Sequence, residues 1–257
     1  MAKFYLTPFF FLLNSISLFA QADKIDTDRP DQTESAFLVP KGFFQGEIGF
    51  NIENNKNLKT LVHPTGLWKY GLTKRFELRL ITEIISEETS LLIPQGNKFE
   101  SGLLPVQIGS KIAFWEEKGI LPKTSLIFHF GIPALSSSKF KPPHLAPNFR
   151  FTMSHSLSNT FGIGYNIGAE WNGIDKTPEW VYTIAPGINI GKNWYGYIEA
   201  FGAIKKNEPA QHSFDAGLAY FISNNTKIDI SSGFGISKSA PDSYVAIGFS
   251  FRTKTTK

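Results

Sequence analysis

The chain has 257 residues and a formal net charge of +4, with 24 phenylalanines, 22 glycines and no cysteine. A chain without cysteine has no disulfide framework, thiolate metal site or lipidated cysteine anchor. Its lysines and arginines form no stripe interleaved with stacking aromatics, which argues against nucleic-acid binding. Many aromatic and glycine residues with few helix formers indicate an all-β protein with tight turns.

Residues 1–22 have the pattern of a secretory signal peptide. Lys3 supplies the positive start, Phe9–Leu13 is the centre of the apolar segment, and small residues precede a cleavage point after Ala20 or Ala22. The apolar run is shorter than the ~20 residues that a membrane-spanning helix needs. We therefore expect cleavage and export rather than a retained membrane anchor.

Residues 23–41 form a polar segment, called the leader here, and its charged residues are candidates for a gate. Asp26, Asp28, Arg29 and Asp31 lie shortly before the first predicted strand. One hypothesis is that the leader folds into the periplasmic mouth of a barrel, with Arg29 meeting a lumenal acid such as Glu77 or Glu83. The alternative is a solvated periplasmic tail, which the same composition allows equally.

Residues 42–252 contain about twelve segments with the pattern of a strand. In the first, 43–53, Phe and Ile alternate with Gln45, Glu47 and Glu53, which gives one apolar and one polar face. The others are predicted near 60–70, 75–85, 103–114, 123–133, 148–156, 160–171, 180–190, 193–204, 211–222, 226–236 and 242–252, followed by a short tail, 253–257. Pro64 predicts a bulge or a shortened second strand. Strands of about ten residues have the length needed to cross a bilayer at a tilt.

The connections alternate in length along the chain. Those after even-numbered strands are short (71–75, 156–160, 191–193 and 223–226, with 116–122 somewhat longer), whereas we expect longer loops at 54–59, 86–102, 134–147, 172–179, 205–210 and 238–242. Aromatic side chains gather near strand ends: Trp68, Tyr70, Trp115, Trp194 and Tyr195 on the short-turn side, and Trp171, Trp180 and Tyr182 on the other. Short periplasmic turns, long outer loops and two aromatic girdles are typical of outer-membrane barrels.

The sequence therefore predicts a single transmembrane antiparallel β-barrel of about 12 strands in the outer membrane of a Gram-negative bacterium. Its apolar face contacts lipid and its polar face lines a lumen. The expected partners are outer-membrane lipid, the barrel-assembly machinery and an unidentified small molecule. No cofactor is implied, and the five histidines are dispersed without metal-ligand spacing.

The polar faces of the predicted strands supply the candidate lumen-lining residues. These are Glu47, Glu53, Glu77, Arg79, Glu83, Lys111, His129, Arg150, Glu170, Glu199, Asp215 and Asp229, with Gln45 and Arg252 on the same faces. Arg252 belongs instead to the periplasmic rim if the last strand is shifted outward. Mixed charges allow either a salt-bridge network that fills the barrel or a permeation path through such a network, and the sequence leaves both open.

The phrase TDRPDQTESAFLVPKGFFQGEIGF (27–50) resembles a family of bacterial outer-membrane barrels linked to a meta-pathway of phenol degradation. The resemblance continues through YGLTKRFELRL (70–80), PVQIGSK (105–111), LPKTSLIFHFGIP (121–133), HSLSNTFGIGYNIG (155–168), FDAGLAYFISNNTKIDISSGFGI (214–236) and YVAIGFSFR (244–252). It implies a transporter, and uptake of aromatic compounds by association, but no site residues. The ending FAQ of the signal peptide resembles proteins of the Bacteroidota.

We therefore expect a passive transporter of a small, aromatic or apolar molecule rather than an enzyme. A lipase- or protease-like barrel would need Ser and His within hydrogen-bond reach, and only His155, Ser156, Ser158 and Asn159 form a cluster of this kind. A barrel with a filled lumen and a structural or surface-interaction role is a further alternative. An energy-coupled receptor would require a plug domain and 22 strands, for which this chain has no room.

Overall fold

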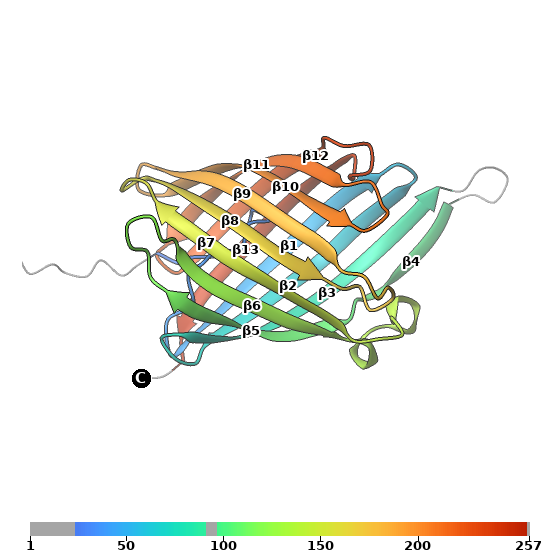
Figure 1. The fold of residues 1–257 in the computed structure, drawn as a ribbon, viewed down its shortest axis with the longest axis horizontal. Coiled ribbons are helices and arrows are strands. Elements are labelled where there is room, and N and C mark those ends of the chain that lie inside the picture. The colour runs from blue at the N-terminus through green and yellow to red at the C-terminus, as the bar shows by residue number, and fades with distance from the viewer. Residues whose placement is uncertain (1–23, 91–96, 256–257) are drawn as a thin grey trace, which may run out of the picture.

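The computed structural model describes residues 24–90 and 97–255, so the predicted signal peptide lies outside the described residues. Antiparallel strands form one closed barrel (Figure 1). The strands are β1 (Phe43–Asn55), β2 (Leu58–Gly71), β3 (Phe76–Ser90), β4 (Asn97–Leu103), β5 (Val106–Trp115), β6 (Lys123–Ile132), β7 (Ala146–Ser156), β8 (Phe161–Glu170), β9 (Glu179–Ile190), β10 (Trp194–Lys205), β11 (Gln211–Ser223), β12 (Thr226–Gly235) and β13 (Ser243–Lys254). Two short 3-10 turns, η1 (Pro133–Leu135) and η2 (Ser138–Phe140), lie between β6 and β7.

The barrel closes because β1 pairs with β13, from Phe43 opposite Lys254 to Asn54 opposite Ser243. The strands β4 and β5 both pair with β3, so they share one position in the wall and the barrel has twelve positions. The predicted all-β barrel of about 12 strands is confirmed. Closure gives every described strand except β4, which pairs with β3 alone, a hydrogen-bonding neighbour on both sides, as a sheet surrounded by lipid requires.

Three local predictions were wrong. The single strand predicted at 103–114 is interrupted at Leu104 and Pro105, because proline lacks the N–H that a ladder needs. The loop predicted at 86–102 is instead an extension of the sheet, in which β3 and β4 pair up to Ser90 opposite Asn97. The loop predicted at 54–59 is a two-residue turn, with Lys56 in the left-handed region at φ 54°.

Side chains divide between the two faces of the wall as the alternation predicts. Large apolar side chains point outward and stay exposed, for example Ile184 (43%), Ile198 (51%) and Ile247 (52%). The most deeply buried side chains are mainly polar and point inward, for example Lys111 and Glu77. This inversion is expected of a wall whose outer face meets lipid and whose inner face encloses a polar lumen.

Tryptophan side chains lie at both ends of the barrel. Trp115 and Trp194 lie at strand ends beside the short turns, and Trp171 and Trp180 lie at the opposite end. Tyr195 was wrongly predicted to belong to the girdle: it alternates with Trp194, points inward and lines a cavity.

The first and last described residues lie beside the short turns. Strand β13 continues through Lys254, into the predicted tail, and Arg252 lies at this end, where its Nε donates to Asn225 Oδ1 in the β11–β12 turn. Pro64 coincides with a register shift between Val62 and Thr65, as the bulge prediction expected. Among the described residues, no helix is long and apolar enough to span a membrane.

Candidate functional site

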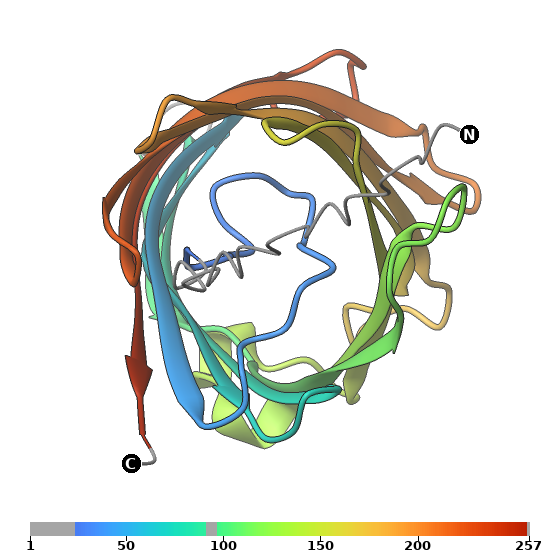
Figure 2. The same cartoon turned by 90° about the vertical axis from the view of Figure 1, so that its left-hand side faces the viewer.

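The leader lies inside the barrel, where Figure 2 shows it as a loop across the lumen. It begins at the short-turn end, where Ile25 N donates to Asn224 O (2.7 Å). It extends inward to Gln32 and Thr33, which contact Glu199 near the middle of β10. It then returns to the same end of the barrel, where β1 begins.

The backbone of the leader is bonded to side chains of the wall. Its N–H groups donate to wall acceptors: Asp28 and Arg29 to Glu47, Gln32 to Glu199, Glu34 to Asn166, and Val39 to Glu77. Its carbonyl groups accept from wall donors: Arg29 from Lys227, Gln32 from Arg150, Ala36 from Ser125, and Ser35 and Phe37 from Lys111. Buried backbone groups need such partners, so the inner wall provides a specific seat for this segment.

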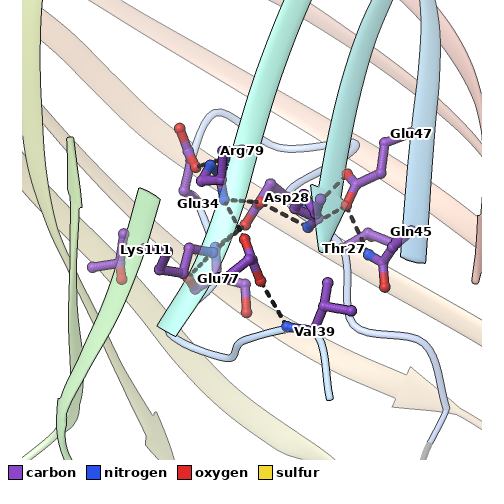
Figure 3. Close-up of polar contacts among 12 residues, drawn as sticks. Thr27, Asp28, Glu34, Val39, Gln45, Glu47, Glu77, Arg79 and Lys111 are labelled. Atoms are coloured by element: carbon purple, nitrogen blue, oxygen red, sulfur yellow. Dashed lines mark hydrogen bonds and ion pairs between the residues drawn. The ribbon is translucent and has the colours of Figure 1, made fainter. Parts of the chain in front are cut away.

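Asp28 is the centre of the most highly charged part of the seat (Figure 3). Its Oδ2 lies 2.9 Å from both Lys69 Nζ and Arg79 Nη1, and its Oδ1 lies 3.0 Å from Lys111 Nζ. The Ser35 N–H also donates to Oδ1, at 2.9 Å. Asp28 is 6% exposed, so these contacts take place away from water.

Arg79 connects this cluster to two further groups. Its Nη2 lies 2.6 Å from Glu34 Oε2 of the leader, and its Nη1 lies 3.2 Å from Glu77 Oε1. Its Nε donates to His129 Nε2 (3.1 Å). Because a guanidinium only donates, His129 Nε2 must be unprotonated, and its Nδ1 then donates to Asn148 Oδ1.

Arg29 contacts a lumenal acid, as the gate hypothesis expected, but not one of the two acids that were named. Arg29 Nη2 pairs with Asp229 Oδ1 at 3.0 Å, on β12, rather than with Glu77 or Glu83. Glu83 instead accepts from Thr65 Oγ1 (2.7 Å). The guanidinium lies against Gly49 and Gly248, where a Cβ would overlap it.

The remaining candidates lie at other heights of the lumen. Asp215 is opposite Glu199 in the β10–β11 ladder and accepts from the Tyr244 hydroxyl. Arg150 Nη2 pairs with Glu170 Oε1 at 2.5 Å. Asp26 and Asp31 line a cavity beside the leader, and Glu53 lines a second one.

These two cavities lie on opposite sides of the leader. The larger, about 310 Å³, lies toward the short-turn ends of β7, β8 and β9 and is lined in part by Asp31, Phe37 and Tyr195. The smaller, about 100 Å³, lies beyond the leader tip and is lined in part by Gln32 and Phe201. The leader therefore separates two spaces inside the barrel.

The cluster around His155 lacks the geometry for nucleophilic catalysis. His155 Nε2 faces the Tyr165 hydroxyl (3.3 Å), and its Nδ1 lies 3.5 Å from Glu117 Oε1. Ser158 Oγ accepts instead from the N–H groups of Thr160 and Phe161. Within the described ranges, no group of His, Cys, Asp and Glu has a metal-binding arrangement.

Several residues of the seat were missed in the sequence. Lys69 and Lys227 are buried wall cations that bond to the leader, and Glu34, Asn166 and Ser125 also take part. Lys69 stands between Trp68 and Tyr70, and Lys227 directly before Ile228. The alternation of polar and apolar residues therefore marked both lysines as inward-facing, although each lies close to a strand end.

Comparison of sequences identifies the family. The family described as "Putative MetA-pathway of phenol degradation" matches residues 27–253, which includes most of the leader as well as the wall. The chain belongs to this family. No curated protein sequence is significantly similar to the chain.

Solved structures with the same fold are outer-membrane barrels. The COG4313 outer membrane channel from Pseudomonas putida F1 is similar with a TM-score of 0.65 at 10% identity, over 90% of this chain and 100% of that chain. The NanC porin is similar with a TM-score of 0.53 at 10% identity, over 80% and 98%. The KdgM porin in complex with oligogalacturonate gives a TM-score of 0.50 at 10% identity over the same shares. The chain thus has the fold of an outer-membrane channel.

Proposed function

We propose that this protein is a passive outer-membrane channel for a small molecule and that the leader is its gate. The observation that carries the proposal is the position of the leader, which crosses the lumen between two cavities. In this proposal, movement of the leader opens the path from one cavity to the other. The channel fold and family membership support transport rather than enzymatic activity.

The bonds that hold the leader suit a movable segment. Apart from the backbone bond of Ile25 to Asn224, most of them involve a side chain, whereas the wall is held by continuous backbone ladders. The leader is irregular from Lys24 to Pro40 and forms no strand with the wall. It can therefore leave the seat without opening the sheet, and side-chain donors and acceptors on both sides regain water.

The proposed substrate is a small aromatic molecule, an inference that rests on the family description. The larger cavity, about 310 Å³, has enough volume for such a molecule, since an engineered cavity of about 150 Å³ binds benzene. Phe37, Phe161 and Tyr195 offer it aromatic surface there. Recognition by the barrel-assembly machinery and an origin in the Bacteroidota stay predictions.

The test is deletion of residues 24–40 with the signal peptide kept. We expect the shortened barrel to pass ions and phenol into liposomes faster than the complete chain. A matched control replaces the same residues by a Gly/Ser segment of equal length, which should also permit faster flux because it lacks the charged contacts. Unchanged flux in both variants would contradict the gate and favour a structural barrel with a filled lumen.

A structural role has one observation in its favour. The lumenal network includes many buried charged groups, and such networks also fill narrow barrels. In that case the deletion should lower thermal stability without any gain in flux. The two measurements therefore distinguish the two functions.

A further inference from the structure

We infer that Lys69, Arg79 and Lys111 form a binding site for a small organic carboxylate, and that Asp28 of the leader is its internal ligand. A carboxylate from outside would compete with Asp28 and favour the open position of the leader. This inference rests on the proposed gate and names the class of ligand that regulates it.

The three cations bind one carboxyl group through both of its oxygens. Lys69 and Arg79 contact Oδ2 and Lys111 contacts Oδ1, each within 3.0 Å. The three side chains come from the neighbouring strands β2, β3 and β5 and are at most 3% exposed. Charge-assisted bonds to both oxygens are the strong and geometrically specific mode of carboxylate recognition.

The wall itself indicates that an anion belongs at this position. Lys69 and Arg79 lie directly opposite each other in the β2–β3 ladder. Like charges at directly opposed positions destabilise a sheet unless a counter-charge lies between them. Asp28 Oδ2 supplies that charge, at 2.9 Å from each cation.

The balance of charges depends on the leader. Around the site the wall contributes three cations but only two carboxylates, Glu47 and Glu77. The leader adds Asp28 and Glu34. When the leader leaves, the wall keeps three cations against two carboxylates, and the like charges on neighbouring strands repel one another. A free carboxylate that binds there would remove this penalty and stabilise the open state.

The ligand class follows from the group that now fills the site. The side chain of Asp28 is chemically an acetate, so acetate fits where Asp28 lies. Benzoate carries the same carboxylate on an aromatic ring, and its ring would occupy space that the leader fills. A ligand that binds only the open state shifts the population toward that state in proportion to its concentration over its dissociation constant.

The first experiment replaces the internal ligand. Asp28→Gly leaves a gap of acetate size, whereas Asp28→Asn fills the gap with a neutral amide. Thermal unfolding in detergent is followed with sodium acetate or sodium chloride at equal ionic strength. We expect acetate to raise the Tm of Asp28→Gly at concentrations about tenfold below those at which chloride acts, and to leave Asp28→Asn unchanged. Equal effects of acetate and chloride on Asp28→Gly would overturn the inference.

The second experiment needs no variant, so it holds even where Asp28→Gly does not fold. Ion flux through the complete chain in liposomes is compared with benzoate and with benzamide, which has the same size and no charge. We expect benzoate alone to increase flux. Equal flux with both compounds contradicts competition with Asp28. If the leader is not a gate, deletion of the leader will leave flux unchanged. The Tm measurement on Asp28→Gly still tests carboxylate binding in that case.

Discussion

Gly49 and Gly248 face each other across the β1–β13 ladder, and the Arg29 side chain of the leader lies against both. A Cβ at either position would overlap the guanidinium. Arg29 then continues to Asp229 on β12. The wall therefore provides space for the leader, through its glycines, as well as charged partners. Substitutions of these glycines should displace the leader to different degrees.

Gly71→Ala should disturb the leader more than Gly248→Ala. A Cβ at Gly71 would overlap the backbone carbonyls of Val39 and Pro40, which cannot move without the leader, whereas at Gly248 only the flexible end of Arg29 must shift. Gly196→Ala is the control, because its Cβ would meet Leu218 Cδ2 at 3.1 Å on the lipid face. We expect ion flux to be highest for Gly71→Ala, intermediate for Gly248→Ala, and unchanged for Gly196→Ala. The reverse order would contradict a seat shaped by glycine.

Lys111→Met should weaken the docking of the leader by about 3 kcal/mol, because it leaves buried acceptors without one of their cations. Lys111 contacts Asp28 and the carbonyl groups of Ser35 and Phe37. The measurement is hydrogen exchange of the Asp28 amide, which is bonded to Glu47 in the docked leader.

The matched control for Lys111→Met is Lys98→Met, which breaks an exposed pair with Glu100 outside the lumen. Exposed pairs contribute little to stability because water screens them. Hydrogen exchange of the Asp28 amide in Lys98→Met should therefore be the same as in the unaltered chain. If both variants exchange alike, the buried cluster does not hold the leader.

A disulfide between leader and wall should lock the gate. Thr33 Oγ1 and Thr183 Oγ1 lie 2.6 Å apart, so Thr33→Cys with Thr183→Cys places two thiols within bonding range in a chain that has no other cysteine. We expect low flux in the oxidised protein and recovery on reduction. Thr33→Cys alone should not respond to the reductant. If flux is equal in both redox states and mass spectrometry verifies the disulfide, permeation does not require movement of the leader.

The loss of stability caused by an arginine substitution on the lipid face should depend on the depth of the residue in the membrane. Ile184 lies near the middle of β9 and Ile190 at its end, and both are exposed on the outer face. A midplane arginine costs about 2–4 kcal/mol and one near the interface about 0–1 kcal/mol. Ile184→Arg should therefore lower the free energy of unfolding in lipid far more than Ile190→Arg. Similar losses of unfolding free energy in the two variants would mean that Ile184 does not lie deeper in the membrane than Ile190.

The alternation of side chains predicted much of the wall. It placed Glu77 inward and Leu78 outward on β3, as observed, because a strand turns successive residues to opposite faces. Connections were less predictable. The turn at Lys56 and Asn57 has the polar composition of a longer loop, and only the pairing of β1 with β2 fixes its length.

The seat of the leader depended on contacts that no local pattern contains. Asp28 and Arg29 were visible as charged residues, but their partners are set by barrel closure, which brings Asp229 to Arg29 across 200 positions of sequence. Arg29 is bonded to Asp229 although Glu77 and Glu83 are much nearer in sequence. Choosing among lumenal acids requires the register of several strands at once.

The wide spread of the leader's partners has a consequence for the order of folding. The leader precedes every strand in the chain, yet it is bonded to Glu47 on β1, Asn166 on β8 and Lys227 on β12. A seat built from strands so far apart exists only after nearly the whole wall has formed, since contacts distant in sequence come late. The first part of the described chain to be synthesised is thus the last to be fixed. We therefore expect a newly inserted barrel to have an open, hydrated lumen until the leader enters it.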